Sequence, residues 1–556
     1  MTQRSGGRIL VDQLLIQGTE RLTCVPGESY LAVLDALHDA KIDVLACRNE
    51  GGAAMMAEAY GKLTGKPGIC FVTRGPGATN ASPGIHIAAQ DSTPMILFIG
   101  QVERAMRERE AFQEVDYKAF FGSMAKWVVE VDSAARLPEL VARAYRVACQ
   151  GRPGPVVVAL PEDVLTEMAD VPDAPKVALA EAWPGPQDMA RFGDMLRKAK
   201  KPLFILGGSR WSAAAQKSLI AFSEKFAVPI TTSFRRAHLF PSDHPNYVGD
   251  VGIGPNPRLA ARVKEADLLV LLGARMSEMP SSAYSLIDVP VPRQTLVHIH
   301  PGAEELGKVY QPALAIQATP NAFCTALAEL AHPNDAPWAP ATKEARLEFL
   351  DWTDQPPRLP GKFQYGEVMR WLRDRLPADA IIANGAGNYS IWIHRYYRFR
   401  KLGTQLAPTS GSMGYGVPAA VMAKRQHPDS PVIAFAGDGC FMMNGQEFAT
   451  AVQYGIPLIV IILDNSMYGT IRMHQEREYP GRISATSLNN PDFAAYAKAF
   501  GGHGERIETT DGFAPAFERA VKSGKPAILH CLIDPEAITP ARTLSQIRDD
   551  AIKSGK

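Results

Sequence analysis

Two short polar sequences, each placed directly after an apolar stretch, carry side chains that suit a divalent cation. Residues 432–436 run into Gly437-Asp438-Gly439, and residues 458–463 run into Asp464-Asn465. The interval between them fits one strand, crossover helix and strand unit, which would bring Asp438 and Asn465 to the same sheet edge. Their carboxylate and amide oxygens suit Mg²⁺, whose coordination is commonly completed by phosphate oxygens and water. The glycines let phosphate approach the backbone, so the pair predicts a diphosphate–Mg²⁺ site, with a simple turn and a helix cap as the alternative.

A glutamate at the start of a predicted helix is the second candidate. Asn49 is a good N-cap residue, and Glu50 follows it in the first turn of a stretch rich in glycine, alanine and methionine. One interpretation is that Glu50 only complements the helix dipole, which is worth about 0.3–1 kcal/mol. The other is chemical: burial would raise the pKa of the carboxyl and keep it protonated as a hydrogen-bond donor. The residues alone leave both interpretations open.

The elements that must position these residues follow one rhythm, in which an apolar run ends at glycine or a small polar residue and a helical pattern follows. Continuous apolar runs of this kind are typical of parallel strands covered by helices on both faces. We therefore predict three tandem doubly wound α/β domains, whose ligands lie beyond the carboxyl ends of the strands. The predicted strands are residues 68–73, 95–100, 155–160, 202–207, 268–273, 432–437 and 458–463.

Two stretches rich in proline, alanine and charge, residues 171–187 and 332–361, are predicted linkers, the second with a short helix-like insert. They divide the chain into domains of plausible size. We expect a first domain over 1–170, a central domain over 188–331, a third domain over 362–538, and a polar tail over 539–556 that is either a disordered end or a lid.

The composition excludes several classes of function. Lys and Arg total 59 against 58 Asp and Glu, which leaves no electrostatic footprint for nucleic acid or an anionic membrane. The seven cysteines form no CxxC pair, which argues against a disulfide framework and a zinc site. No apolar run approaches the roughly twenty residues of a membrane-spanning helix, and no signal peptide is recognisable at the start. We expect a cytoplasmic protein.

The Gly-Asp-Gly sequence and the later asparagine, in this order, resemble the signature of thiamine-diphosphate enzymes. The resemblance extends over nearly the whole chain and is closest to the acetolactate synthase-like branch. It implies a pyrimidine-binding, a central and a diphosphate-binding domain, with Mg²⁺ held by Asp438, Asn465 and the carbonyl of Met467. The residues that it implies at the diphosphate are Asn388, Tyr389, Gly437, Gly439 and Cys440.

The same resemblance assigns residues to the pyrimidine half of the coenzyme. Glu50 matches the family's acid, which donates to ring N1′ and favours the imino tautomer that takes the proton from thiazolium C2. The Gly411 carbonyl would accept from the 4′-amino group while Met413 wedges between the two rings, although a methionine among glycines is also an ordinary gap filler. Two loops that match pyrimidine-side segments, and could otherwise be tight turns, contain Pro26, Gly27 and Asn80.

The chain departs from acetolactate synthases at three positions, which read Glu162, Met279 and His474 where that branch usually has lysine, arginine and tryptophan. The arginine and tryptophan recognise the second 2-oxo acid, and losing the arginine removes a bidentate carboxylate partner. We therefore expect a different acceptor. Candidate substrate contacts are Phe112, Gln113, Arg472 and His474, with solvated helix residues as the alternative for the last two.

The central block carries small and polar residues where acetolactate synthases hold FAD. Related decarboxylases bind ADP there or leave the site empty, and the sequence does not decide among the three. The residues concerned are Arg152, Gly207, Gly208, Thr232, Gly273 and Arg275.

The resulting expectation is a thiamine-diphosphate and Mg²⁺-dependent enzyme that decarboxylates a 2-oxo acid and joins the fragment to an aldehyde or ketone. The family implies a homodimer or homotetramer in which Glu50 and Asp438 meet across a subunit interface. The alternatives are a 2-hydroxyacyl-CoA lyase and, outside catalysis, a thiamine-diphosphate-binding paralogue without turnover. A nicotinamide dehydrogenase is disfavoured because the glycine-rich segment 75–80 ends in Asn80 where the dinucleotide motif needs glycine.

Overall fold

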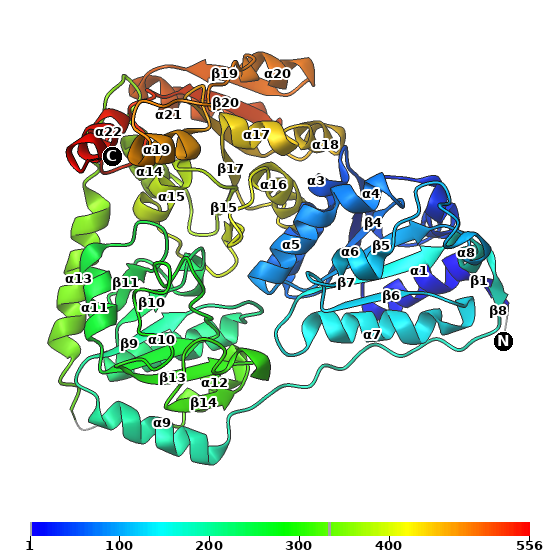
Figure 1. Ribbon diagram of the computed structural model, residues 1–556, viewed down its shortest axis with the longest axis horizontal. Helices are drawn as coiled ribbons and strands as arrows, with labels where there is room; N and C mark the ends of the chain where they lie inside the picture. Colours follow the sequence, from blue (N-terminus) through cyan, green and yellow to red (C-terminus); the bar gives the residue numbers. More distant parts are fainter. Residues whose placement is uncertain (1–2, 332–334, 556) are drawn as a thin grey trace. The chain divides into compact units, whose positions relative to one another are not determined.

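The computed structural model describes residues 3–331 and 335–555. It contains three six-stranded sheets in which every strand pair is parallel, and helices flank each sheet (Figure 1). The prediction of three doubly wound α/β domains is therefore confirmed. A short antiparallel pair, β1 (Arg4–Ser5) and β8 (Met168–Ala169), lies outside these sheets.

The first sheet has the strand order β3-β2-β4-β5-β7-β6. Three of its inner strands, β4, β5 and β7, are mainly apolar and wholly buried, as the uninterrupted runs predicted. Its strands are β2 (Arg21–Cys24), β3 (Asp43–Ala46), β4 (Gly68–Val72), β5 (Met95–Gln101), β6 (Trp127–Glu130) and β7 (Pro155–Pro161), and its longer helices are α1 (Gly6–Gln17), α2 (Leu31–His38), α3 (Glu50–Thr64), α5 (Ser82–Asp91) and α7 (Leu137–Cys149).

The central sheet has the order β11-β10-β9-β12-β13-β14 and buries a core rich in leucine, isoleucine and phenylalanine. Its strands are β9 (Pro202–Leu206), β10 (Ile230–Thr232), β11 (Tyr247–Asp250), β12 (Leu268–Leu272), β13 (Thr295–His300) and β14 (Leu314–Gln317), and its helices are α9 (Pro186–Lys198), α10 (Ala213–Phe226), α11 (Pro257–Glu265) and α12 (Pro320–Leu327).

The third sheet has the order β16-β15-β17-β18-β20-β19, so β17 and β18 are neighbours, as the metal motif required. Its strands are β15 (Ile381–Asn384), β16 (Gln405–Leu406), β17 (Val432–Gly437), β18 (Ile459–Asp464), β19 (His503–Ile507) and β20 (Ala527–Leu532). The helices of the same stretch of sequence are α14 (Tyr365–Arg375), α15 (Tyr389–Tyr396), α16 (Gly416–Gln426), α17 (Asp438–Asn444), α18 (Glu447–Gln453), α19 (Gly469–Glu478), α20 (Phe493–Ala499) and α21 (Thr510–Ser523).

The contacts divide the chain into two compact units. Unit 1 comprises the chain up to Ala180 together with Pro408–His427 and Asn444–Ile456, and unit 2 comprises the remaining segments. The first sheet is therefore accompanied in unit 1 by α16 and α18, which come from the last third of the sequence. The central and third sheets lie in unit 2.

Two segments differ from their expected character. Residues 339–354, inside the second predicted linker, form the sixteen-residue helix α13 (Ala339–Asp354), so the linker does contain a helix, but a longer one than the short insert predicted. His332, Pro333 and Asn334 of this linker lie outside the described residues. The helix forms because Ala345 and Phe349 pack on the central core.

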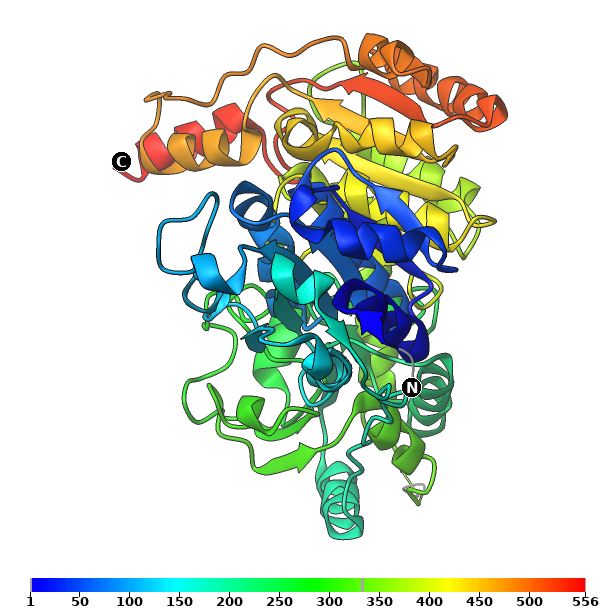
Figure 2. The ribbon, with the colours of Figure 1, turned by 90° about the vertical axis from the view of Figure 1, so that its right-hand side faces the viewer.

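The polar tail is ordered over most of its length. Its helix α22 (Leu544–Lys553) lies beside α19 in Figures 1 and 2, where Ile547 packs with Ile538 and Met473. Of the two alternatives for the tail, a disordered end therefore does not apply to Leu544–Lys553, and the lid stays a prediction.

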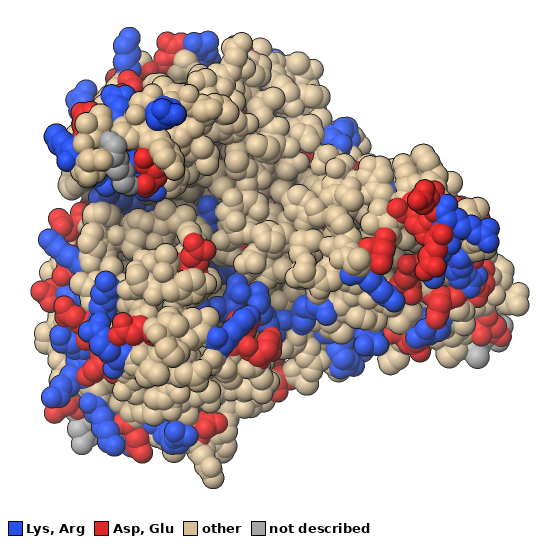
Figure 3. Space-filling model, viewed as in Figure 1, with Lys and Arg blue, Asp and Glu red and all other residues tan. Residues whose placement is uncertain are grey.

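Charged side chains of both signs are visible on the surface. On the face displayed in Figure 3, acidic and basic side chains lie next to one another in several groups, with broad uncharged areas between the groups. Among the described residues, no helix is both long and apolar enough to cross a membrane.

Candidate cofactor and metal site

The carboxyl ends of β17 and β18 bring two carboxylates together in unit 2. Gly437 pairs with Leu463 across the two strands, so Asp438 and Asp464 follow at the same edge. The amide nitrogen of Asn490 donates to both, at 2.7 Å from Asp438 and 2.9 Å from Asp464. The spacing of the two motifs predicted that Asp438 and Asn465 would reach this edge; the carboxylate that shares a donor with Asp438 is that of Asp464, the residue before Asn465. Neither Asp464 nor Asn490 was selected from the sequence, and Asn490 carries no pattern that would have revealed it.

The two carboxylates have opposite electrostatic settings. Burial raises the pKa of Asp438 above its ordinary value, and the neighbouring Asp464 carboxylate adds to that rise. Burial opposes ionisation of Asp464 as well, but hydrogen bonds from His530, at 2.9 Å, and from the backbone of Ser466 outweigh it and lower the pKa. A buried carboxyl beside a permanent carboxylate is a favourable place for a cation, because the cation would relieve the repulsion.

The turn after β18 is strained and tightly held. Ser466 has a φ of +55°, which is uncommon for a residue other than glycine, and Asp464 stabilises it by accepting from its backbone nitrogen. The Met467 carbonyl accepts from the nitrogen of Gly469 at 2.8 Å and retains a second lone pair for a ligand. The Asn465 amide lies against Gly469, where an added Cβ would come 2.9 Å from its nitrogen.

Residues expected at the diphosphate occupy two different settings. Tyr389 lies beneath the motif, with its hydroxyl accepting from the nitrogen of Gly385 and contacting the Cys440 thiol at 3.4 Å. The side chain of Asn388 instead binds the Thr470 hydroxyl and the carbonyl of Ile538. The structure therefore places Tyr389 in contact with Cys440 of the motif. The side chain of Asn388 instead connects the segment after β15 to α19.

The pyrimidine-side residues meet around the start of α3 in unit 1. Asn49 caps the helix by accepting from Gly51 at 2.8 Å, as predicted, and Glu50 accepts at 3.0 Å from the side-chain amide of Asn80. Asn80 ends a short helix, α4 (Pro76–Asn80), where a tight turn was the alternative. The loop with Pro26 and Gly27 lies beside this segment, because a Cβ on Gly27 would meet the Thr73 side chain at 2.6 Å.

A buried glutamate that the sequence analysis did not select supports the same turn. Glu447 accepts from the backbone nitrogens of Arg48 and Asn49, at 3.0 and 2.9 Å, and from the Thr450 hydroxyl. A Cβ on Gly52 would meet its carboxylate at 2.6 Å, so glycine is required there. The regular helical pattern of α18 concealed this role.

The loop that carries Gly411 and Met413 is anchored to the same unit at both ends. Thr409 donates its backbone nitrogen and hydroxyl to Asp91, and the Tyr415 hydroxyl donates to Glu58 at 2.7 Å. Gly411, with a φ of +69°, allows the turn between the two anchors.

A buried ion cluster joins these anchors. Lys62 pairs with Glu58 at 3.1 Å and with Asp91, and the three side chains are at most 8% exposed. Glu58 also accepts from the Thr93 hydroxyl at 2.7 Å. Burial raises the pKa of Glu58, which Lys62 opposes and Asp91 reinforces. The cluster fixes the Gly411 loop relative to α3, on which Glu50 stands.

The candidate substrate residues lie in different units. In unit 1 Phe112 is 71% exposed, and Gln113 has a φ of +65°. In unit 2 Arg472 pairs at 3.0 Å with Glu476, which is 1% exposed, so Arg472 is not the solvated helix residue of the alternative. His474 is exposed, and its pKa is lowered by partial burial and by Arg477.

The central-domain residues expected near FAD have structural contacts of their own. A Cβ on Gly207 would meet the Cα of Ala274 at 2.7 Å, and one on Gly273 would meet the Gly207 carbonyl at 2.6 Å. The loops after β9 and β12 therefore pack on each other, which accounts for both glycines without a ligand. Arg152, in unit 1, donates to Ser92 and to the carbonyl of Ala89 at the end of α5.

Other FAD candidates follow the central strands. Thr232 ends β10, and its hydroxyl contacts that of Tyr247 at 3.1 Å. Gly208 adopts a φ of +77°, and its carbonyl accepts from Arg236. Arg275 is half-buried in the loop after β12.

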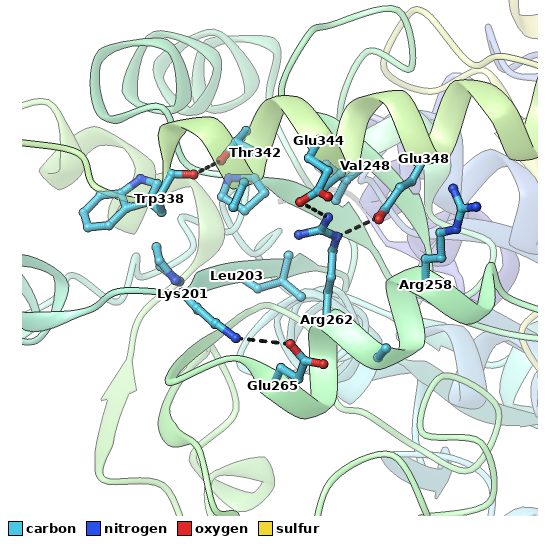
Figure 4. Close-up of a pocket in the computed structure, with 15 residues that line it drawn as sticks. Lys201, Leu203, Val248, Arg258, Arg262, Glu265, Trp338, Thr342, Glu344 and Glu348 are labelled. Atoms are coloured by element: carbon cyan, nitrogen blue, oxygen red, sulfur yellow. Dashed lines mark hydrogen bonds and ion pairs between the residues drawn. The ribbon is translucent and has the colours of Figure 1, made fainter.

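A cavity of about 360 Å³ lies between α11 and α13, at the amino ends of β9 and β10 (Figure 4). Its floor is apolar, and its rim charges pair with one another, as in the contacts of Arg262 with Glu344 and Glu348 and of Lys201 with Glu265. The cavity lies at the opposite end of these strands from the loops expected to bind a nucleotide.

The comparisons with known proteins cover all three domains. Family models described as the N-terminal TPP binding domain, the central domain and the C-terminal TPP binding domain of thiamine pyrophosphate enzymes match residues 4–120, 189–327 and 385–531. The chain is 33% identical to the acetolactate synthase isozyme 2 large subunit of Escherichia coli (strain K12), over 95% of this chain and 96% of that protein. It is 33% identical to the acetolactate synthase large subunit of Parasynechococcus marenigrum (strain WH8102), over 94% and 87%.

Proposed function

The chain belongs to the thiamine pyrophosphate enzymes, in their acetolactate synthase-like branch, and from that membership we propose that it decarboxylates a 2-oxo acid and joins the resulting fragment to an acceptor carbonyl. The observation that carries the proposal is the edge of the third sheet, where the buried side chains of Asp438 and Asp464 both accept from the amide of Asn490. Asp438 is flanked there by Gly437 and Gly439. A structural turn would not require two carboxylates at one strand end.

We propose Mg²⁺ as the cation of this edge. The donor set fits a hard ion, because Asp438 offers a carboxylate, Asn465 an amide oxygen and Met467 a carbonyl with a spare lone pair. The cation would also offset the charge of Asp438, whose pKa burial raises. The diphosphate would meet this cation and the amino end of α17, and Tyr389 and Cys440 would support the backbone beneath it.

When bound, thiamine diphosphate supplies a thiazolium carbon that attacks a carbonyl and accepts the electrons released by decarboxylation. Glu50 would be the carboxyl that forms a hydrogen bond with ring N1′, while the side-chain amide of Asn80 keeps that carboxyl oriented. The carbonyl of Gly411 would accept from the 4′-amino group. The Lys62 cluster would maintain the separation between Glu50 and that carbonyl.

We propose that the active form is at least a homodimer, with Glu50 and Asp438 of different subunits serving one coenzyme. Met442, Met443 and Ile471 of unit 2 are exposed, and a partner subunit could cover them. Glu50→Gln and Asp438→Asn chains carrying different tags would be co-expressed and the mixed dimers isolated. Such dimers hold one intact site of two and should recover about half of wild-type activity. No recovery would place both residues in the same chain.

The acceptor is proposed to differ from that of acetolactate synthases, because Met279 cannot bind a second carboxylate as arginine does. A panel of 2-oxo acids and acyl-CoA thioesters, followed by CO₂ release and product mass with Mg²⁺ and thiamine diphosphate added, tests the activity. Absence of CO₂ from every 2-oxo acid would contradict decarboxylation, and cleavage of a 2-hydroxyacyl-CoA would replace it. Flavin absorbance of the purified protein decides whether FAD is bound.

A further inference from the structure

A strained loop in unit 1 presents a large aromatic side chain to its surroundings. In the segment 107–116, Glu108, Glu110 and Gln113 have φ values of +58°, +53° and +65°. Such conformations persist in residues other than glycine only where neighbouring contacts hold them, and they cluster at functional sites. At the tip of the loop Phe112 is 71% exposed. A rigid loop with an exposed aromatic residue is suited to contact a substrate.

One buried arginine holds the tip of this loop. Arg74, directly after β4, donates its Nε to the carbonyl of Phe112 at 3.0 Å, and its Nη1 pairs with the carboxylate of Glu162. The side chain of Arg74 is only 11% exposed, so this is not an exposed surface pair of the kind that contributes little. The planar guanidinium links the end of β7 to the loop in a fixed geometry.

The backbone beside Arg74 contacts the same loop. The nitrogen of Gly75 donates to the Tyr117 hydroxyl at 3.0 Å, and a Cβ on Gly75 would meet that of Gln113 at 2.7 Å. The chain then continues into α4, whose last residue Asn80 binds Glu50. Arg74 therefore lies in the segment that leads to α4 and Glu50, and it also contacts the loop with Phe112 and Gln113.

The pair also explains one departure from acetolactate synthases. A lysine at position 162 would face the guanidinium of Arg74, whereas Glu162 neutralises it. The positive charge that holds the loop is thus the guanidinium of Arg74, shortly after β4, and the carboxylate of Glu162 is its counter-ion.

We propose that Arg74, oriented by Glu162, is a positioning residue that fixes Phe112 and Gln113 against the acceptor, and so helps to set which acceptor is used. This rests on the proposed function. Losing Arg74 should weaken binding of the acceptor. It should not disturb the coenzyme, because the contact of Asn80 with Glu50 and the anchors of the Gly411 loop remain intact.

The test compares Arg74→Ala, Arg74→Lys and Glu162→Gln with Arg21→Ala. Arg21 is a matched control, since it is also in unit 1, is 16% exposed and is ion-paired, to Asp43 at 2.8 Å, but does not contact the loop. The first readout needs no coenzyme: hydrogen–deuterium exchange of residues 107–116 should be about tenfold faster in Arg74→Ala. Arg74→Lys should fall between Arg74→Ala and wild type.

The second readout is kinetic. In Arg74→Ala the KM for the acceptor should rise about tenfold while the KM for the donor stays within about twofold, and Arg21→Ala should change neither. If exchange in the loop is unchanged in Arg74→Ala and Glu162→Gln, or if Arg21→Ala has the same effects, the proposal is wrong. Wild-type protein that neither binds thiamine diphosphate nor releases CO₂ would instead overturn the proposed function. The exchange experiment would still decide whether Arg74 holds the loop.

Discussion

The buried cluster of Lys62, Glu58 and Asp91 gives a sharp prediction about stability. Lys62 is 8% exposed and lies between two carboxylates that are fully buried. Lys62→Met keeps most of the side-chain volume but leaves both carboxylates without their cation. Removing one partner of a buried ion pair typically costs about 3–5 kcal/mol in the free energy of unfolding.

The matched control is Lys66→Met, just beyond the end of the same helix. Lys66 pairs with Glu20 at 2.8 Å, but both side chains are more than half exposed. An exposed pair of this kind contributes about 0–1 kcal/mol. Thermal unfolding at neutral pH should therefore show a much lower midpoint for Lys62→Met than for Lys66→Met, and Lys62→Arg should stay close to wild type.

The pH dependence supplies a second check. Burial raises the pKa of Glu58 in the folded protein above that in the unfolded chain. Its contribution to stability is therefore complete below the unfolded pKa and is lost as the pH rises through the folded pKa. In Lys62→Met the deficit should shrink on acidification, because protonation removes the unpaired charge. A deficit equal to that of Lys66→Met, or one that grows towards acid pH, would refute the role of the cluster.

Three further changes have definite expected outcomes. Glu50→Gln should lower kcat by about 10²–10⁴-fold with thiamine diphosphate still bound, measured by steady-state kinetics and calorimetry; unchanged kcat would exclude Glu50 as the proton donor. Asn490→Ala should raise the Mg²⁺ concentration needed for half-maximal coenzyme binding, because the carboxylate of Asp438 loses the donor that orients it for the cation; an unchanged titration would exclude that role. Deleting the chain from Thr543 onward should lower the thermal midpoint, because it uncovers Met473 and Ile538; no shift would mean that the packing of α22 on α19 contributes little.

Much of the fold was predictable because parallel strands buried on both faces have a simple signature. The runs at 95–100 and 155–160 became the buried strands β5 and β7, and the two motifs after β17 and β18 met at one edge. By contrast, the full length of α13 was not predicted, because its sequence mixes charge and proline. Its stability comes from tertiary contacts that a local pattern does not record.

The candidate site was predictable only where a residue adjoins a strand end or a helix start. Asp438 and Glu50 meet that condition. Asn490 lies in an irregular segment, which an isolated bridge between Met467 and Ser487 joins to the turn after β18, and a local pattern does not record its contact with Asp438. Glu447 reads as an ordinary residue of a helix, and its contact with the turn before Glu50 depends on how distant segments of unit 1 pack together.

The central claim is that a coenzyme diphosphate is held through a cation at the edge formed by β17 and β18. The direct measurement is a calorimetric titration of thiamine diphosphate into protein freed of divalent cations, with and without added Mg²⁺, for wild type and Asp438→Asn. The account predicts binding to wild type only when Mg²⁺ is present, and weaker or no binding to the variant. Equal binding with and without Mg²⁺, or no binding by the wild type under either condition, would contradict it.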